Sequence, residues 1–315
     1  MLPSVQAFLA QIVDYAGMFP PAKLPLEDAL ANYLRERQTS PHAWMLGRFV
    51  CPASRLSEVN RVADAQLPIT ALGQQAAGVD QFVPQLDADL RAIDEFRAEG
   101  RVVDALELAL PKDVPITSLL NVLPAVHRKL ASGNLRGYLE IPFSSTWHAE
   151  VDQLTECLRE LNQGIAAPIG MKLRSGGLAA GAFPSDAQVA HFIIGCRDAA
   201  VPWKATAGLH HPRRHWDAAL NLWHHGFLNV FGAGVLAHAL PLTEADLIEI
   251  LADRDAQHFR FAASGFAWQD WSCSVAQIEE ARLHFASSFG SCSFTEPCED
   301  LLAMGLLDTD ECLLG

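Results

Sequence analysis

The chain has 315 residues, of which 50% are hydrophobic and 19% are charged. This composition supports a large buried core and excludes a disordered or low-complexity protein. Acidic residues outnumber basic ones by 37 to 23, and the resulting formal charge of -14 opposes binding to the phosphate backbone of a nucleic acid.

Short β-type segments alternate with helical segments along most of the chain. An N-terminal helix is followed by a turn-rich piece at 14–25, and a second helix is predicted near 26–36. Strands are predicted at 45–50, 69–73, 102–110, 137–141, 169–173, 203–207 and 227–231. Helical patterns are predicted at 87–99, 116–132, 148–162, 185–199 and 216–223. Repeated βα units of this kind indicate a parallel sheet.

No linker separates these units, which favours one closed barrel over two domains. We therefore expect an α/β fold, a (β/α) barrel of the TIM type with seven or eight parallel strands. The alternative is a doubly wound open sheet, which has the same alternation. Residues 44–262 are expected to form the barrel, with N-terminal helices and a loop at 1–43 and a C-terminal hairpin and helical extension at 263–315.

The eighth strand is ambiguous. Residues 259–261 could supply it, but 259–271 also has the pattern of a hairpin that turns at Ser264 and Gly265. Residues 275–289 after it predict a long helix.

The cysteine pattern and the termini bear on the compartment. Seven cysteines form an odd set with neither a CxxC pair nor the paired spacing of a zinc site, so free thiols are expected. The N-terminus lacks the basic start of a secretory signal, and the longest apolar stretch, 226–242, is too short and too interrupted to span a bilayer. We therefore expect a cytoplasmic protein with no nucleic-acid or membrane partner, and a homo-oligomer remains open.

Charged residues lie on strands that a barrel buries on both faces. An unpaired charge in the interior is costly, so these charges need a reason. Side chains alternate along a strand, which puts Gly170, Lys172 and Arg174 on one face, predicted to face the lumen. The same alternation places five further residues there, namely Arg48, Glu107, Glu140, Lys204 and Asn229, with Thr206 on the face of Lys204.

The predicted lumen holds four basic groups and two acidic ones in an acidic protein. This excess favours a pocket for a small anionic molecule carrying phosphate or carboxylate. The alternative is that these charges form structural ion pairs that close the barrel. Residues predicted to bind substrate are Arg48, Glu107, Arg174, Ser175, Gly176, Gly177, Thr206, His210, His211 and Asn229. Among them the segment 175–177 offers backbone amides, and a histidine of the loop offers an acid/base group or anion ligand.

Lys172 and Lys204 lie 32 residues apart, the length of one strand, a crossover helix and the start of the next strand. A lysine in a partly dry pocket beside another cation has a lowered pKa, and its neutral amine can attack a carbonyl to form a Schiff base. Glu140 on the neighbouring strand is a candidate for proton transfer. Catalytic roles are therefore predicted for Lys172, Lys204 and Glu140.

The chain lacks the motifs of common cofactors. No dinucleotide fingerprint or phosphate-binding P-loop is present, and the histidine pairs at 210–211 and 224–225 do not have the spacing of a metal site. We expect chemistry that needs neither a cofactor nor a metal.

The layout of Lys172 in MKLRSGG and Lys204 in KATAGLHH resembles the tandem lysine strands of the deoxyribose-phosphate aldolase group. The resemblance implies that Lys172 forms the imine and that Lys204 tunes it, as in a class I aldolase. A second resemblance spans the chain. The motifs DYAGMFPPA, MKLRSGG, WKATAGLHHP, HGFLNVF and SFGSCSFTEPCEDL are similar to those of a family of bacterial proteins of unknown function.

Three functions are consistent with these features. The first is a cofactor-independent, aldolase-like lyase that acts on a small phosphorylated or carboxylated carbonyl compound through a lysine Schiff base. The second is a non-covalent isomerase or transferase, in which basic residues clamp the anion while Glu140 or Glu107 moves a proton. The third is an anion-binding protein without turnover, which predicts a closed lumen with its charges paired and no room for a ligand.

Overall fold

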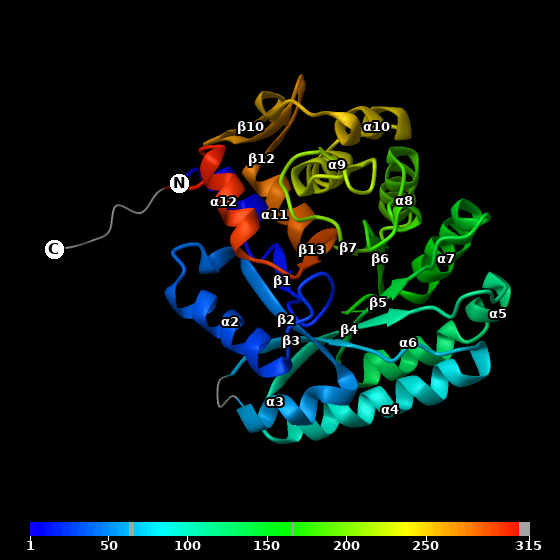
Figure 1. The fold of residues 1–315 in the computed structure, drawn as a ribbon. Helices are drawn as coiled ribbons and strands as arrows, with labels where there is room; N and C mark the ends of the chain where they lie inside the picture. Colours follow the sequence, from blue (N-terminus) through cyan, green and yellow to red (C-terminus); the bar gives the residue numbers. More distant parts are fainter. Residues whose placement is uncertain (63–65, 166, 309–315) are drawn as a thin grey trace.

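The computed structural model describes residues 1–62, 66–165 and 167–308, and its centre is a closed barrel of parallel strands (Figure 1). The barrel strands in chain order are β1 Val13–Tyr15, β2 Leu46–Pro52, β3 Pro68–Leu72, β4 Val102–Ala109, β5 Arg136–Glu140, β6 Gly170–Arg174, β7 Trp203–Thr206 and β13 Ala286–Ser291. Their order around the barrel is β1-β13-β7-β6-β5-β4-β3-β2, and β2 pairs back with β1. The predicted TIM-type barrel is confirmed, and the open sheet is wrong because no edge remains between β1 and β2.

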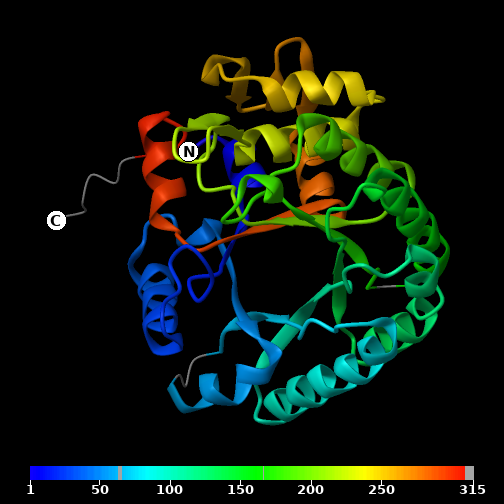
Figure 2. The same ribbon diagram turned by 45° about the vertical axis from the view of Figure 1, so that its right-hand side comes forward.

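Helices surround the barrel, as Figure 2 shows from a second direction. They are α1 Pro3–Leu9, α2 Leu26–Thr39, α3 Leu56–Val62, α4 Val79–Ala98, α5 Ile116–Leu120, α6 Leu123–Ser132, α7 Trp147–Leu161, α8 Asp186–Asp198, α9 Phe227–Ala239, α10 Glu244–Ala252, α11 Val275–His284 and α12 Thr295–Ala303. Within the described ranges, none of these helices is both long enough and apolar enough to cross a membrane.

Helix α8 illustrates how the sequence builds one of these units. Ser185 caps it by accepting a hydrogen bond from the backbone N–H of Gln188, whose side chain bonds back to the cap. Val189, Phe192 and Cys196 follow at helical spacing and are buried. The helix therefore begins at a defined residue and presents one apolar stripe to the barrel.

Within the described ranges, two small sheets lie outside the barrel. The first pairs β8 His215–Asp217 with β9 Leu222–His224, and the second contains β10 Phe259–Ala262, β11 Gly265–Trp268 and β12 Trp271–Ser274. Ala262 lies opposite Gly265 in an antiparallel pair, so the hairpin at 259–271 is confirmed and 259–261 does not supply the eighth barrel strand.

Six of the seven predicted strands are confirmed, and the one at 227–231 is wrong. This segment begins helix α9, in which Phe227 and Phe231, one helical turn apart, both pack against the ring of Phe289 of β13. A helix buried on all sides has a continuous apolar run, which periodicity alone cannot distinguish from a buried strand.

The predicted helix at 216–223 is also wrong. Asp217 accepts hydrogen bonds from the backbone N–H groups of Ala219 and Leu220, which turns the chain between β8 and β9. A short polar side chain that bonds the backbone two and three residues ahead favours a turn over a helix.

The first and last barrel strands come from the two segments that were expected to be additions. β1 is formed by Val13 and the first two residues of the turn-rich piece, and β13 replaces the end of the helix predicted at 275–289. The barrel therefore extends beyond the expected limits of 44–262. A strand of three residues is too short for a periodic pattern, and ASSFGS lacks the apolar run that marked the other strands.

Gly170, the first residue of β6, allows the Tyr138 ring to pack closely against that strand. Its Cα is the register partner of Tyr138 on β5, and a Cβ there would lie 2.5 Å from the Pro202 carbonyl oxygen and 2.8 Å from Cδ1 of Tyr138. The absence of a side chain thus lets the Tyr138 ring lie against the backbone of β6.

Replacing Gly170 by alanine is expected to lower the free energy of unfolding by about 1–3 kcal/mol, because the new methyl group overlaps backbone. Gly133→Ala is the matched control. Gly133 ends α6 with a φ of -83°, and a Cβ there meets its nearest atom at an ordinary 3.5 Å. Urea unfolding of both variants checks the prediction, and equal stabilities would contradict it.

Candidate active site

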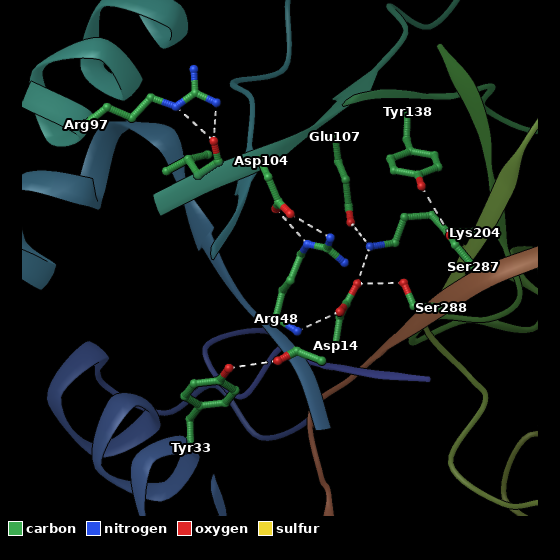
Figure 3. Close-up of polar contacts among 12 residues, drawn as sticks. Asp14, Tyr33, Arg48, Arg97, Asp104, Glu107, Tyr138, Lys204, Ser287 and Ser288 are labelled. Atoms are coloured by element: carbon green, nitrogen blue, oxygen red, sulfur yellow. Dashed lines mark hydrogen bonds and ion pairs between the residues drawn. The ribbon is translucent and has the colours of Figure 1, made fainter. Parts of the chain in front are cut away.

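A line of alternating charges runs through the lumen. Its members in order are Asp14 on β1, Lys204 on β7, Glu107 on β4, Lys172 on β6, Glu140 on β5 and Arg174 on β6. β4 and β7 are not neighbours in the barrel, so the pair of Glu107 and Lys204 must cross its interior. Figure 3 shows Lys204 between Glu107 and Asp14.

The distances in this line are short at every step. Lys204 Nζ lies 2.6 Å from Asp14 Oδ2 and 2.5 Å from Glu107 Oε1. Lys172 Nζ lies 2.7 Å from Glu107 Oε2 and 2.9 Å from Glu140 Oε2. Arg174 Nε donates to Glu140 Oε1 at 2.7 Å. Each interior cation thus has two carboxylate partners, which offset the cost of removing it from water.

Both lysines are buried, with Lys172 6% exposed and Lys204 1% exposed. Lys172 is the register partner of Glu140 on one side and of Lys204 on the other, so the three predicted catalytic residues lie side by side.

The pKa values differ from the sequence-based expectation. Burial alone lowers the pKa of Lys172, but Glu107 and Glu140 outweigh it and the net pKa is raised. The pKa of Lys204 is raised in the same way, because Asp14 and Glu107 outweigh burial. The expected lowering beside another cation is therefore wrong, since Glu107 lies between the two ammonium groups. Burial raises the pKa of Glu107, but the two lysines outweigh burial and lower the net pKa to about 2.

The lower end of the lumen holds a second ion pair. Arg48 Nε and Nη2 donate to Asp104 Oδ1 and Oδ2, each at 2.7 Å, and the Arg48 backbone N–H donates to Asp14 Oδ1 at 2.8 Å (Figure 3). Ser288 Oγ also donates to Asp14, at 2.8 Å. Both Arg48 and Asp104 lie in the first half of their strands, away from the C-terminal ends where barrel enzymes bind substrates. Arg48 is thus placed as a structural partner and not at the predicted substrate site.

The expected excess of positive charge is wrong. Asp14 and Asp104 were not assigned to the lumen, and with them four acidic groups balance four basic ones. Asp104 escaped the alternation rule because the register of β3 and β4 shifts between Ile69 and Thr70, where Ile69 pairs with Val103 and Thr70 with Ala105. Asp14 lies on the strand that the sequence did not reveal.

A pocket of about 740 Å³ opens at the C-terminal ends of the strands. Lys172 and Glu107 line it, whereas Lys204 lies deeper in the line of charges. The charges are thus paired as the non-catalytic hypothesis predicted, but its expectation of no room for a ligand is wrong. A second cavity of about 610 Å³ lies beside the first, and Arg174 and Lys112 line both.

Lys112 is a cation of the pocket that the sequence did not single out. It is exposed in the loop after β4, and among the described residues no carboxylate forms an ion pair with it. Arg174 has a side chain 40% exposed. Its Nε donates to Glu140 and its Nη1 to the Gly176 carbonyl at 3.5 Å, which leaves Nη2 without a partner among the described residues. These two side chains offer free N–H donors at the junction of the two cavities.

Other predicted residues are distributed around the pocket. Gly177 and Thr206 line it, and His210 lines it with Nδ1 3.0 Å from Glu296 Oε2. Ser175 is buried beneath, and its hydroxyl has no hydrogen-bond partner in the described part of the chain. Gly176 packs against the next loop so closely that a Cβ would lie 2.8 Å from Gly208 Cα.

His211 and Asn229 lie elsewhere. His211 Nδ1 contacts Asp300 Oδ2 at 2.6 Å in a separate surface cavity. Asn229 is on α9, where its amide donates to the Ile250 and Asp253 carbonyls. Its placement in the lumen is wrong because it followed from the incorrect strand at 227–231. Among the residues that the structure describes, no three His, Cys, Asp or Glu side chains are grouped to hold a metal ion.

Comparison with models of known protein families gives no match, and comparison with curated proteins gives none either. The motif resemblance to bacterial proteins of unknown function therefore stays a prediction. Among solved structures, the chain is similar to one described as "Unique tetrameric structure of deoxyribose phosphate aldolase from Aeropyrum pernix". The TM-score is 0.44 and the identity 12%, over 66% of this chain and 80% of that chain. This likeness concerns the fold alone.

The line of charges predicts strong coupling between Asp14 and Lys204. Asp14→Asn leaves one positive charge uncompensated and Lys204→Met leaves one negative charge, so each is expected to cost about 3–5 kcal/mol of unfolding free energy. The double variant restores neutrality, and its cost should fall below the sum by about 2 kcal/mol. Denaturant unfolding of the four proteins measures this coupling, and additive costs would show that the two groups act independently.

The free energy of unfolding is expected to decrease at acidic pH because Glu107 becomes protonated. Its pKa lies at about 2 in the folded protein, below the ordinary value of 4.5, so its contribution is complete above pH 4.5 and is lost as the pH falls toward 2. Glu107→Gln should flatten the pH dependence of the unfolding free energy in this window by up to about 1.4 kcal/mol per pH unit. Glu95→Gln, at an exposed site on α4, is the control and should keep the slope of the parent protein.

Proposed function

We propose that this protein is an aldolase-like lyase that acts on a small anionic carbonyl compound through an imine on Lys172. The observation that carries the proposal is the position of this amine. Within the described residues, Lys172 is the one buried lysine that lines the pocket, at the end of the barrel where such enzymes bind substrates. Two carboxylates lie within hydrogen-bond distance of it.

The raised pKa of Lys172 means that a proton must leave before the amine can attack. Glu140 is the acceptor, because its Oε2 lies 2.9 Å from Nζ and its other oxygen bonds Arg174. A substrate anion that pairs with Arg174 would weaken the positive field that holds the pKa of Glu140 low. Binding of the anion would thus help Glu140 to take the proton from Lys172.

The covalent steps use only this chain's groups and water. The neutral amine adds to the carbonyl carbon, and the carbonyl oxygen takes up one proton from the amine nitrogen and one from protonated Glu140 and leaves as water to give an iminium ion. Cleavage of the bond between the α carbon and the hydroxyl-bearing β carbon sends its electron pair toward the iminium to form an enamine, while a carboxylate accepts the proton of that hydroxyl group and the β carbon leaves as a carbonyl compound. Protonation of the enamine and hydrolysis of the imine release the second product.

Glu107 and Lys204 have positioning roles in this scheme. Glu107 has a pKa of about 2, so it stays ionised and compensates the cationic iminium. Lys204 holds Glu107 from the other side and does not line the pocket.

A second candidate is a non-covalent isomerase or transferase. The raised pKa values of both lysines favour it, since ammonium groups bind anions but do not attack carbonyls. In this case Lys172 and Arg174 would hold the substrate, and Glu140 would move a proton.

Borohydride trapping tests the imine. The protein is incubated with carboxylated and phosphorylated aldehydes and ketones, reduced, and mapped by peptide mass spectrometry. At least one compound is expected to add its reduced mass to Lys172, and none to Lys204. Lys172→Arg, which keeps the positive charge, should abolish the label.

Failure to label any lysine, with binding of the same compounds detectable, would exclude the imine. The non-covalent candidate would then remain, and turnover surviving in Lys172→Arg would support it.

A further inference from the structure

The wall of the pocket differs in chemistry from one side to the other. The side formed by β4 to β6 carries Glu107, Lys112, Lys172 and Arg174. The adjoining side is formed by β1 to β3 and by the loop after β1. Its lining residues are Ala16, Phe19, Pro20, Pro21, Val50 and Leu72, all apolar. A third part of the wall, at the end of β7, in the loop after it and on β8 and β9, includes the polar residues Thr206, His210, Asp217 and His224.

The apolar side offers no polar side chain to a ligand. The two prolines lack an N–H, and the backbone N–H groups of Ala16 and Phe19 are already bonded to the carbonyls of Ser291 and Ala16. A hydroxyl group placed here would lose its water without gaining a partner, whereas a hydrocarbon would gain from leaving water.

The two sides are close enough for one small molecule to touch both. Leu72 on the apolar side is the register partner of Glu107 on the charged side. A volume of about 740 Å³ is within the range of small-molecule sites. The cations with free donors, Lys112 and Arg174, lie at the edge of the charged side, next to the second cavity.

We infer that the pocket takes an amphipathic acid whose anionic group binds Arg174 and Lys112 and whose unsubstituted hydrocarbon part packs against the apolar side. Polyhydroxylated compounds such as sugar acids and sugar phosphates are a poor match for that side. This assignment, combined with the proposed function on which it then rests, makes the substrate an oxo acid that carries the hydroxyl group needed for cleavage and an aliphatic or aromatic substituent.

Binding of saturated acids tests the ligand class separately from the imine, because these probes carry no carbonyl group to attack. Calorimetric titration of the whole protein with butanoate, pentanoate and hexanoate should give affinities that rise about threefold per methylene group. The six-carbon polyhydroxylated acid gluconate should bind at least about tenfold more weakly than hexanoate. An affinity independent of chain length, a preference for gluconate, or no binding by any of these acids would overturn the inference.

A polar substitution on the apolar side tests where the hydrocarbon part of the ligand binds. Leu72→Gln should weaken hexanoate binding about fivefold and leave gluconate binding within about twofold, because the lost contact is apolar. Leu161→Gln, a half-buried leucine of α7 outside both cavities, is the matched control and should bind hexanoate as the parent protein does. Equal weakening by the two variants would overturn the assignment of this side.

Trapping with 2-oxohexanoate then separates the two proposals. Chain-length dependence in the saturated acids without an adduct would remove the imine and keep the amphipathic pocket. An adduct with hydroxylated oxo acids but not with 2-oxohexanoate would keep the imine and overturn the amphipathic pocket.

Discussion

The pairing of buried charges across the lumen is the constraint on which the rest of the site depends. Three carboxylates alternate with two lysines and Arg174 in an unbroken line, and five of the eight strands contribute to it. An unpaired charge at any of the interior positions would cost several kcal/mol, so the register of these strands and the chemistry of the site are determined together. The same pairing raises the pKa of both lysines, which sets the main demand on any covalent mechanism.

Lys172 must lose a proton in a covalent mechanism, and Glu140, which is shared between Lys172 and Arg174, is the group that could accept it. One of its oxygens bonds Lys172 and the other bonds Arg174, so an anion bound to Arg174 would affect the group that takes the proton from the amine in the proposed mechanism. In the absence of an anion, Arg174 keeps the pKa of Glu140 low and Lys172 stays charged. In the proposed mechanism, one carboxylate therefore couples substrate recognition to activation of the amine.

Much of this arrangement was predictable from alternation along the strands, and the failures have specific causes. Lys172 and Arg174 alternate with Met171 and Leu173, which form a clear apolar face of the strand, so the common orientation of the two cations could be inferred. Asp14 lies on a strand of three residues, below the length at which period two can be recognised. Asp104 depends on a register shift between β3 and β4, which follows from the packing of two strands and not from either one alone. Asn229 was misplaced because a helix buried on all sides has the composition of a strand.

Counting charges along the sequence predicted an anion site inside the barrel, whereas the three-dimensional pairing favours the rim as the place of the proposed anion site. Inside, four basic and four acidic groups compensate one another, so an anionic ligand there would have to displace a carboxylate from its lysine. At the rim, Arg174 is partly exposed and Lys112 has no carboxylate partner among the described residues, so an anion gains attraction without that cost. The substrate's charge would then remain near water while its reactive carbon reaches Lys172, which is an arrangement suited to a ligand with one charged end and one apolar end.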